Sequence, residues 1–146
     1  MNQDILNYIE SQKVCVLAVE ILDGSPHGAT VHYAHTSDPL VFYFETCRDY
    51  RKAEALFGRT TSRATVVIGT DEHTTKTMQL DGLIELLSES EISAFNNIYL
   101  AKFPEKVDKL KDPKYILFKF TPSWWRFTDF GTPIGKVVIS SADGPA

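Results

Sequence analysis

The sequence predicts a mainly β fold of the α+β type: an antiparallel β-barrel of six or seven strands with peripheral helices. The predicted strands are short runs of β-branched and aromatic residues, joined mostly by short turns, as is typical of consecutive antiparallel strands. Helical patterns occur between some strands but do not alternate with them, which argues against a doubly wound parallel sheet. An Asp81-Gly82 pair inside the longest run indicates a bulge that curls the sheet toward closure.

The composition indicates one domain without a strong global charge. The 146 residues suffice for one hydrophobic core, and we expect a single domain over residues 1–140 followed by a disordered tail, 141–146. The net charge of −4 gives no general attraction to nucleic acid or to an anionic membrane, and no apolar run is long enough to span a bilayer. Two widely spaced cysteines and an N-terminus without signal-peptide features favour the cytoplasm and argue against a disulfide scaffold.

The first third of the chain predicts one helix and three strands. Residues 3–12 place apolar side chains on one side, as an amphipathic helix does. Strands are expected at 14–21, 29–35 and 40–46, and the first turn between them is signalled by an Asp-Gly pair. Because short turns join all three, the sequence predicts an antiparallel meander.

The middle of the chain predicts a short helix and two further strands. The helix is expected over 49–57, with Asp49 as its N-cap and Gly58 as its stop. Residues 64–69 form an apolar run that is typical of a buried strand, and 76–87 form the long strand that carries the Asp-Gly bulge.

The last third opens with the capping-box pattern Ser88-Glu-Ser-Glu91, which predicts a helix start. Its expected inner face consists of Ile92, Phe95, Tyr99 and Phe103. The charged segment 105–113 predicts a loop or a single helical turn. Strands are expected at 115–120 and 124–129, interrupted at Thr121-Pro122-Ser123, with a last short strand within 131–139.

The junction after the third strand is the strongest candidate for a ligand site. Thr46, Arg48, Arg51 and Lys52 lie where that strand ends and the next helix begins. A hydroxyl group, a helix N-terminus and several cations together can bind a phosphate group. The structural alternative is a solvated helix surface, on which charged residues are common.

At this junction the sequence resembles the pyridoxamine 5'-phosphate oxidase-like family of FMN-binding split β-barrels. That family follows its third strand with Tyr-Thr-Asn and then Ser-Arg-Lys, which hold the phosphate of flavin mononucleotide (FMN). Here the letters are Glu45-Thr46-Cys47 and Tyr50-Arg51-Lys52, so Thr46, Arg51 and Lys52 match. The order of strands and helices over residues 3–130 also follows the family, and the resemblance implies a split β-barrel and a homodimer.

The resemblance implies further cofactor positions, several of which depart from the family pattern. Thr30 and His35 stand where the oxidase has an arginine and a lysine, and Glu45 brings a negative charge to the site. Thr77 replaces a glutamine that touches the flavin ring. The family's tryptophan in its last strands corresponds to Trp125 or to its neighbour Trp124. The oxidase's basic C-terminal extension is missing, so the resemblance does not imply pyridoxamine-phosphate oxidase activity.

Two functions therefore stay open. The first is a flavin-dependent oxidoreductase acting on an unidentified small molecule, with FMN as cofactor and no catalytic side chain assigned. The alternative is a non-catalytic dimeric binding or stress-response protein, which the departures at Thr30, Glu45 and Thr77 favour. Haem handling would need an iron ligand, for which only His32 and His35 are candidates, and we expect no metal site because these two face opposite sides of a regular strand.

Overall fold

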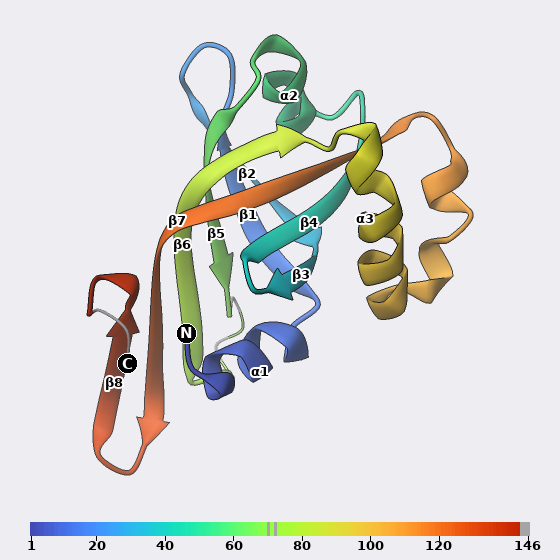
Figure 1. The fold of residues 1–146 in the computed structure, drawn as a ribbon. Coiled ribbons are helices and arrows are strands. Elements are labelled where there is room, and N and C mark those ends of the chain that lie inside the picture. Colours follow the sequence, from blue (N-terminus) through green and yellow to red (C-terminus); the bar gives the residue numbers. More distant parts are fainter. Residues whose placement is uncertain (70, 72, 144–146) are drawn as a thin grey trace.

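The computed structural model describes residues 1–69, 71 and 73–143, and its centre is one antiparallel sheet that curls into a barrel (Figure 1). The order of strands is β2-β1-β5-β6-β7-β4-β3, and β8 pairs with β7. The strands are β1 Val14–Glu20, β2 Pro26–His32, β3 Ala34–Ser37, β4 Leu40–Cys47, β5 Ser62–Ile68, β6 Lys76–Leu86, β7 Tyr115–Thr132 and β8 Gly135–Ser140. The expected mainly β barrel is confirmed, with eight strands because the predicted second strand is divided in two.

The division of that strand at Tyr33 is what splits the barrel. Strands β2 and β3 are separated by this single residue, yet they lie at opposite ends of the sheet order. The expected continuous strand over 29–35, and the three-stranded meander built on it, are therefore wrong. Tyr33 is fully buried, and its hydroxyl donates a hydrogen bond to Ile9 O at 2.6 Å. Because this side chain is held inside the barrel, the backbone leaves one edge of the sheet at Tyr33 and continues at the opposite edge.

The expected bulge in β6 is confirmed, but the extra residue lies on β7. Asp81 pairs with Trp124 and Gly82 pairs with Pro122, so Ser123 is left over. The structure therefore has one continuous strand where two pieces were expected. Because alternate residues face opposite sides of a sheet, one extra residue exchanges the inward and outward positions beyond it.

Three helices cover the ends and one side of the barrel (Figure 1). Helix α1, Gln3–Ser11, buries Ile5, Tyr8 and Ile9. Helix α2, Glu54–Gly58, follows the 3-10 turn η1, Arg51–Ala53, and two further 3-10 turns, η2 Pro104–Lys106 and η3 Lys109–Lys111, follow α3, Glu89–Lys102.

The capping box at the start of α3 is confirmed. The Glu91 carboxylate accepts a hydrogen bond from Ser88 N at 2.9 Å. Phe95, Tyr99 and Phe103 are buried and form a second, smaller core cluster, whereas Ile92 is 37% exposed, so its expected inward position is wrong.

The C-terminal segment differs from the expected disordered tail where the structure describes it. Ser141–Asp143 form a 3-10 turn, η4, and Trp125 N donates a hydrogen bond to Ser141 Oγ at 3.0 Å. Residues 144–146 lie outside the described residues. Within the described part of the chain, no helix has the length and apolar character needed to cross a membrane.

Candidate functional site

A cleft of about 180 Å3 lies at the split of the barrel, between β2 and the end of β4 that does not pair with β3. We call it the β2–β4 cleft. Its lining residues come from β2, β4, the turn after β4, and the segment after α3: Thr30, Val31, His32, Glu45, Thr46, Cys47, Tyr50, Lys52, Lys109 and Tyr115. The cleft thus contains four of the eight predicted cofactor residues, Thr30, Glu45, Thr46 and Lys52, together with side chains that the sequence did not point to.

Thr46 and Lys52 are the two motif residues that meet in this cleft. The Thr46 hydroxyl is buried and has no hydrogen-bond partner among the described residues. Such a group costs free energy unless a ligand or water satisfies it. Lys52 is half-buried, with Nζ 4.6 Å from the centroid of the Tyr50 ring, and burial lowers the pKa of its ammonium group.

The expected helix N-terminus does not contribute to the site. The chain forms only a 3-10 turn before α2, which has five residues, and Asp49 caps neither element. A helix this short has little macrodipole to offer an anion. Arg51 is exposed and does not line the cleft, so of the predicted Arg-Lys pair only Lys52 lies at the site.

Glu45 lines the cleft and forms two ion pairs. Its Oε1 atom lies 2.9 Å from Lys106 Nζ and 2.9 Å from Lys109 Nζ. The Glu45 and Lys106 side chains are only 5% and 10% exposed, whereas that of Lys109 is 37% exposed. Burial alone would raise the pKa of Glu45, but the hydrogen bonds from Lys109 and Lys106 outweigh burial and lower it. The carboxylate is therefore ionised and fully compensated, and it does not repel an anion as an unpaired carboxylate would.

Lys106 also fixes the tautomer of His32. Its Nζ lies 2.9 Å from Glu45 Oε1, 3.0 Å from the Tyr99 hydroxyl and 2.9 Å from His32 Nδ1. An ammonium group has three protons to donate and cannot accept, so Nδ1 of His32 is the acceptor and Nε2 carries the imidazole proton. Burial and the charge of Lys106 lower the pKa of His32 and keep it neutral.

The remaining predicted cofactor residues lie apart from the cleft, except Thr30, which is exposed on β2 and lines it. His35 faces Glu10, with Nδ1 3.3 Å from the carboxylate, in a separate cavity that Lys102 also lines. Thr77 lies on β6, opposite Thr128 of β7. The structure therefore does not gather the expected flavin-ring residues around the phosphate position within one chain.

The bulge at Ser123 decides which tryptophan faces outward. Beyond it, Trp125 pairs with Leu80 and packs against the main core. Trp124 lies on the other face, and the Arg126 guanidinium is 5.9 Å from the centroid of its ring. The expectation that Trp125 contacts a cofactor is therefore not supported by its position, and Trp124 is the tryptophan on the outer face.

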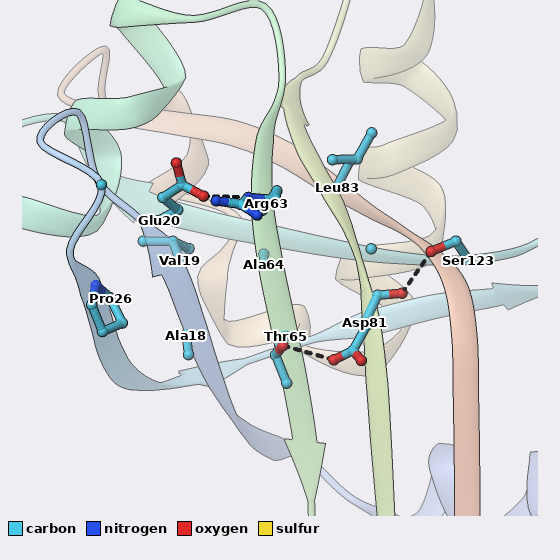
Figure 2. A pocket seen from close by; sticks show the side chains of 12 residues that line it. Ala18, Val19, Glu20, Pro26, Arg63, Ala64, Thr65, Asp81, Leu83 and Ser123 are labelled. Atoms are coloured by element: carbon cyan, nitrogen blue, oxygen red, sulfur yellow. Dashed lines mark hydrogen bonds and ion pairs between the residues drawn. The ribbon is translucent and has the colours of Figure 1, made fainter.

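A groove of about 690 Å3 lies on the outer face of β1, β5 and β6 (Figure 2). We call it the outer-face groove. Its floor includes Ala18 and Ala64, and one wall carries Asp81, whose carboxylate accepts a hydrogen bond from the Thr65 hydroxyl at 2.8 Å. Arg63 is the cation at its rim, and it is paired with Glu20. The groove thus has no unpaired cation for a phosphate group.

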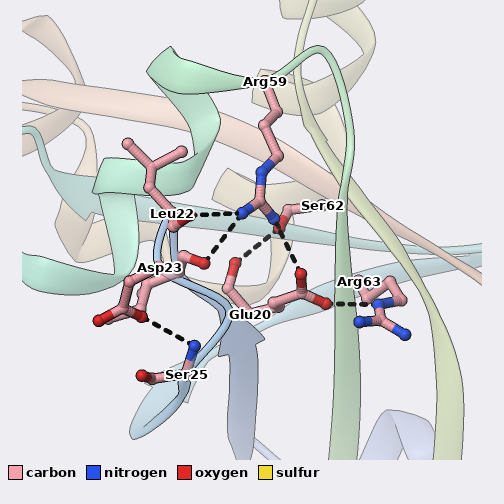
Figure 3. A network of polar contacts seen from close by, with 8 residues as sticks. Glu20, Leu22, Asp23, Ser25, Arg59, Ser62 and Arg63 are labelled. Atoms are coloured by element: carbon pink, nitrogen blue, oxygen red, sulfur yellow. Dashed lines mark hydrogen bonds and ion pairs between the residues drawn. The ribbon is translucent and has the colours of Figure 1, made fainter.

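A polar network next to this groove joins the β1–β2 turn to the start of β5 (Figure 3). The Arg59 guanidinium donates to Glu20 Oε1 at 3.2 Å and to the backbone oxygens of Ile21 and Leu22 at 3.1 and 3.0 Å. The Ser62 hydroxyl donates to Glu20 O at 2.7 Å. These donors are occupied by the protein itself, so the network stabilises the turn and is not a ligand site.

Comparison with known families agrees with this geometry. Residues 1–129 match the family model of pyridoxamine 5'-phosphate oxidase. The chain belongs to this family. The suspected resemblance is thereby confirmed at the level of family and fold. No curated protein sequence gives a significant match.

Solved structures of low sequence identity share the fold. A heme-binding protein from Mycobacterium smegmatis has a TM-score of 0.74 and 15% identity, over 92% of this chain and 54% of that one. A heme storage protein from Vibrio cholerae has a TM-score of 0.68 and 16% identity, over 82% and 88%. A Clostridium acetobutylicum protein related to general stress protein 26, of the pyridoxinephosphate oxidase family, has a TM-score of 0.65 and 18% identity, over 96% and 94%. This chain thus spans about half of the mycobacterial protein and nearly all of the clostridial one.

Proposed function

We propose that the chain binds FMN and that the β2–β4 cleft holds its phosphate group. One observation carries the proposal: two residues of the family's phosphate motif line the same cleft, Lys52 and Thr46, and the buried Thr46 hydroxyl has no hydrogen-bond partner among the described residues. Lys109 adds a second cation there, and His32 adds a neutral imidazole whose Nε2 is protonated. Thr30 brings a further hydroxyl group. This set of donors suits a phosphate monoester, which carries nearly two negative charges at neutral pH.

Glu45 is compatible with the same proposal because its negative charge is already neutralised by ion pairs. Its carboxylate is shared by Lys106 and Lys109, so the lysines near the cleft outnumber the acidic group that lines it. This chain has Glu45 where the family has a tyrosine, and two lysines from the segment after α3 neutralise the added negative charge. A doubly charged phosphate can enter without meeting an unpaired carboxylate.

When bound, FMN would supply electron or hydride transfer, and the protein would position the cofactor and tune its electrostatic surroundings. In this proposal Thr46 and Lys52 orient the phosphate, and the buried ion pair between Glu45 and Lys106 stabilises the wall of the cleft. The substrate would be a small molecule. No nucleic acid or membrane partner is part of the proposal.

The test is an FMN titration followed by visible absorption and flavin fluorescence, with riboflavin as the phosphate-free probe. Lys52→Ala should weaken FMN binding about tenfold or more, because a charge-assisted hydrogen bond to phosphate is lost. It should leave riboflavin binding and the melting temperature nearly unchanged. Lys136→Ala, at an exposed position on β8, is the matched control. Equal affinity of Lys52→Ala and wild type for FMN would contradict the proposal.

A non-catalytic binding protein is the second candidate, and the scattered ring residues favour it. His35 faces a different cavity and Trp125 packs against the core, so one chain presents only the phosphate half of the family's site. Anaerobic mixing of the FMN-loaded protein with NADH and with NADPH separates the two candidates. Bleaching of the flavin absorption with either reductant supports the oxidoreductase, and stable oxidised flavin supports the binding protein.

Two of the structural neighbours are named as heme proteins. The histidines of this chain give haem binding less support than the cleft gives FMN binding. His32 accepts a hydrogen bond from Lys106 at Nδ1 and carries its own proton on Nε2, so neither nitrogen offers a free lone pair to iron. The His35 side chain is only 4% exposed, so a haem would have little access to its ring nitrogens. Hemin titration of the wild type and of a His32→Ala variant, followed by the Soret absorption band, tests this function directly.

We further propose a cytoplasmic homodimer, with the second copy completing the flavin site. The outer face of β1, β5 and β6 is not covered by any helix in the described structure (Figure 1), and the two cysteines are free thiols, as a reducing compartment requires. Sedimentation equilibrium at micromolar concentration should give twice the monomer mass of 16.4 kDa. A monomer would contradict the composite site.

A further inference from the structure

A second concave site, independent of the β2–β4 cleft, lies where the ends of β6 and β7 meet α2, α3 and η3. We call it the α2–α3 pocket. It has a volume of about 370 Å3, within the range of small-molecule sites. Most of its lining side chains are apolar: Phe57, Leu86, Leu87, Ile92, Leu110, Ile116 and Leu117. The polar ones are Arg48, Asp112 and Tyr115, and Pro113 completes the lining.

The apolar lining is accessible to a ligand. Phe57 is 48% exposed and Ile92 is 37% exposed, although both belong to helices that otherwise pack onto the barrel. Ile116 is 7% exposed, so the pocket reaches from these exposed side chains to the main core. An apolar molecule that removes Phe57 and Ile92 from water would gain the free energy of that burial.

The charged groups of the pocket leave one cation without an acidic partner. The Asp112 carboxylate accepts a hydrogen bond from Lys114 N at 3.0 Å, and its Oδ2 lies 3.4 Å from Lys114 Nζ. Arg48 forms no ion pair with the described residues, and its guanidinium stacks over the Phe57 ring, 4.9 Å from the centroid. Its backbone N–H donates to Lys114 O at 2.7 Å, which fixes the main chain beside the pocket.

We infer that the α2–α3 pocket binds an amphipathic carboxylate, a molecule with an apolar chain or ring and one carboxylate group. The apolar part would contact Phe57, Ile92 and Leu110, and the carboxylate would pair with Arg48. A guanidinium fork matches a carboxylate in a bidentate geometry. A single unpaired cation suits a singly charged group better than a phosphate, which distinguishes this site from the cleft with its several lysines.

The site does not depend on flavin binding. Tyr115 lines both cavities, and the adjacent residues Cys47 and Arg48 at the end of β4 line one each. The two sites therefore lie on two sides of the same strand end, but they use different charged residues. Ligand binding here can be measured on the protein without FMN, and it can succeed or fail separately from the cofactor proposal.

The test uses decanoate and the uncharged decanol as probes, with calorimetry and two-dimensional amide NMR as readouts. Wild-type protein should bind decanoate, with amide shifts at residues of the pocket. Arg48→Gln should weaken decanoate binding about three- to tenfold and leave decanol binding unchanged, because only the ion pair is removed. Ile92→Trp should fill the pocket and weaken both probes. Arg126→Gln and Ile134→Trp, at exposed positions outside the pocket, should bind both probes as the wild type does.

Three outcomes would overturn the inference. One is equal affinity of wild type and Arg48→Gln for decanoate, which would show that Arg48 does not pair with the carboxylate. Another is unchanged decanoate and decanol binding in Ile92→Trp, which would place the probe elsewhere. The third is a loss of dimer in sedimentation caused by Ile92→Trp but not by Ile134→Trp, which would make this surface an interface with a second copy.

Discussion

Replacing Glu45 with glutamine removes the carboxylate that Lys106 and Lys109 share, and it should destabilise the fold measurably. The Lys106 side chain is 10% exposed and loses its carboxylate partner in the variant, which leaves only the neutral groups of His32, Tyr99 and the new glutamine to accept from it. Breaking one side of a buried ion pair costs about 3–5 kcal/mol. Lys109 is more exposed and adds less than about 1 kcal/mol. The glutamine oxygen still accepts one hydrogen bond, so we expect a loss of about 3 kcal/mol.

The pH dependence of this loss follows from the direction of the pKa shift. The pKa of Glu45 is lower in the folded protein than its ordinary value of 4.5. A carboxyl group with a lowered folded pKa stabilises the protein fully above its unfolded pKa, and this contribution disappears as the pH falls through the folded pKa. The wild type and Glu45→Gln should therefore differ fully above the unfolded pKa, and the difference should shrink as the pH falls below it and through the lowered folded pKa.

The assay is urea unfolding and thermal melting of both proteins across this pH range. For a protein of this size, about 3 kcal/mol corresponds to a decrease of roughly 6–12 °C in Tm. Glu85→Gln is the matched control, because Glu85 pairs with Lys119 at 3.4 Å at the surface, and it should change the free energy of unfolding by less than about 1 kcal/mol. A Glu45→Gln variant as stable as the control, or a difference that persists in acid, would refute the reasoning.

A double variant gives a second test of the Glu45–Lys106 ion pair. In a Glu45→Gln/Lys106→Met double variant, the buried ammonium group is gone as well as the carboxylate. Replacing both members of a buried ion pair is often neutral or stabilising, because neither charge is left without a partner. The double variant should therefore be more stable than Glu45→Gln alone.

Two further predictions concern the backbone and the thiols. Gly82→Ala would place a Cβ atom 2.1 Å from Thr121 O, so it should destabilise the protein by about 2–3 kcal/mol in urea unfolding, whereas Gly28→Ala, with open space around the new atom, should have little effect. Cys15 is fully buried, and burial raises its pKa to about 12, whereas Cys47 is partly exposed. An aromatic disulfide reagent at pH 8 should therefore modify one thiol in the native protein and a second only after unfolding; two rapidly reacting native thiols would contradict the burial of Cys15.

Local patterns predicted several elements that the structure confirms. The capping box at Ser88 begins a helix because its two polar groups satisfy each other within one turn. The Asp81-Gly82 pair marks a bulge because only glycine fits against the Thr121 carbonyl. Both features depend on residues close in sequence or on a single steric requirement. Such signals can be read without knowing the rest of the fold.

Other features could not be predicted, because they depend on contacts between distant parts of the chain. The break at Tyr33 follows from the packing of its ring inside the barrel and its hydrogen bond to Ile9 O. The lysines that compensate Glu45 lie 61 and 64 residues further along the chain, in a segment whose sequence suggested only a charged loop. The alternation of lysine with other residues there gives no sign of which side chain turns inward.

The sequence by itself determined the family, the antiparallel barrel and the position of the family motif after β4, since short patterns of apolar residues, turn residues and caps specify these locally. Only the tertiary structure decided which motif residues meet. It brings Thr46 and Lys52 together in a cleft, turns Arg51 to solvent and supplies Lys109 from elsewhere. The physical reason is that a site is defined by positions in space, and these depend on the curl of the sheet, which brings β2 into contact with β4.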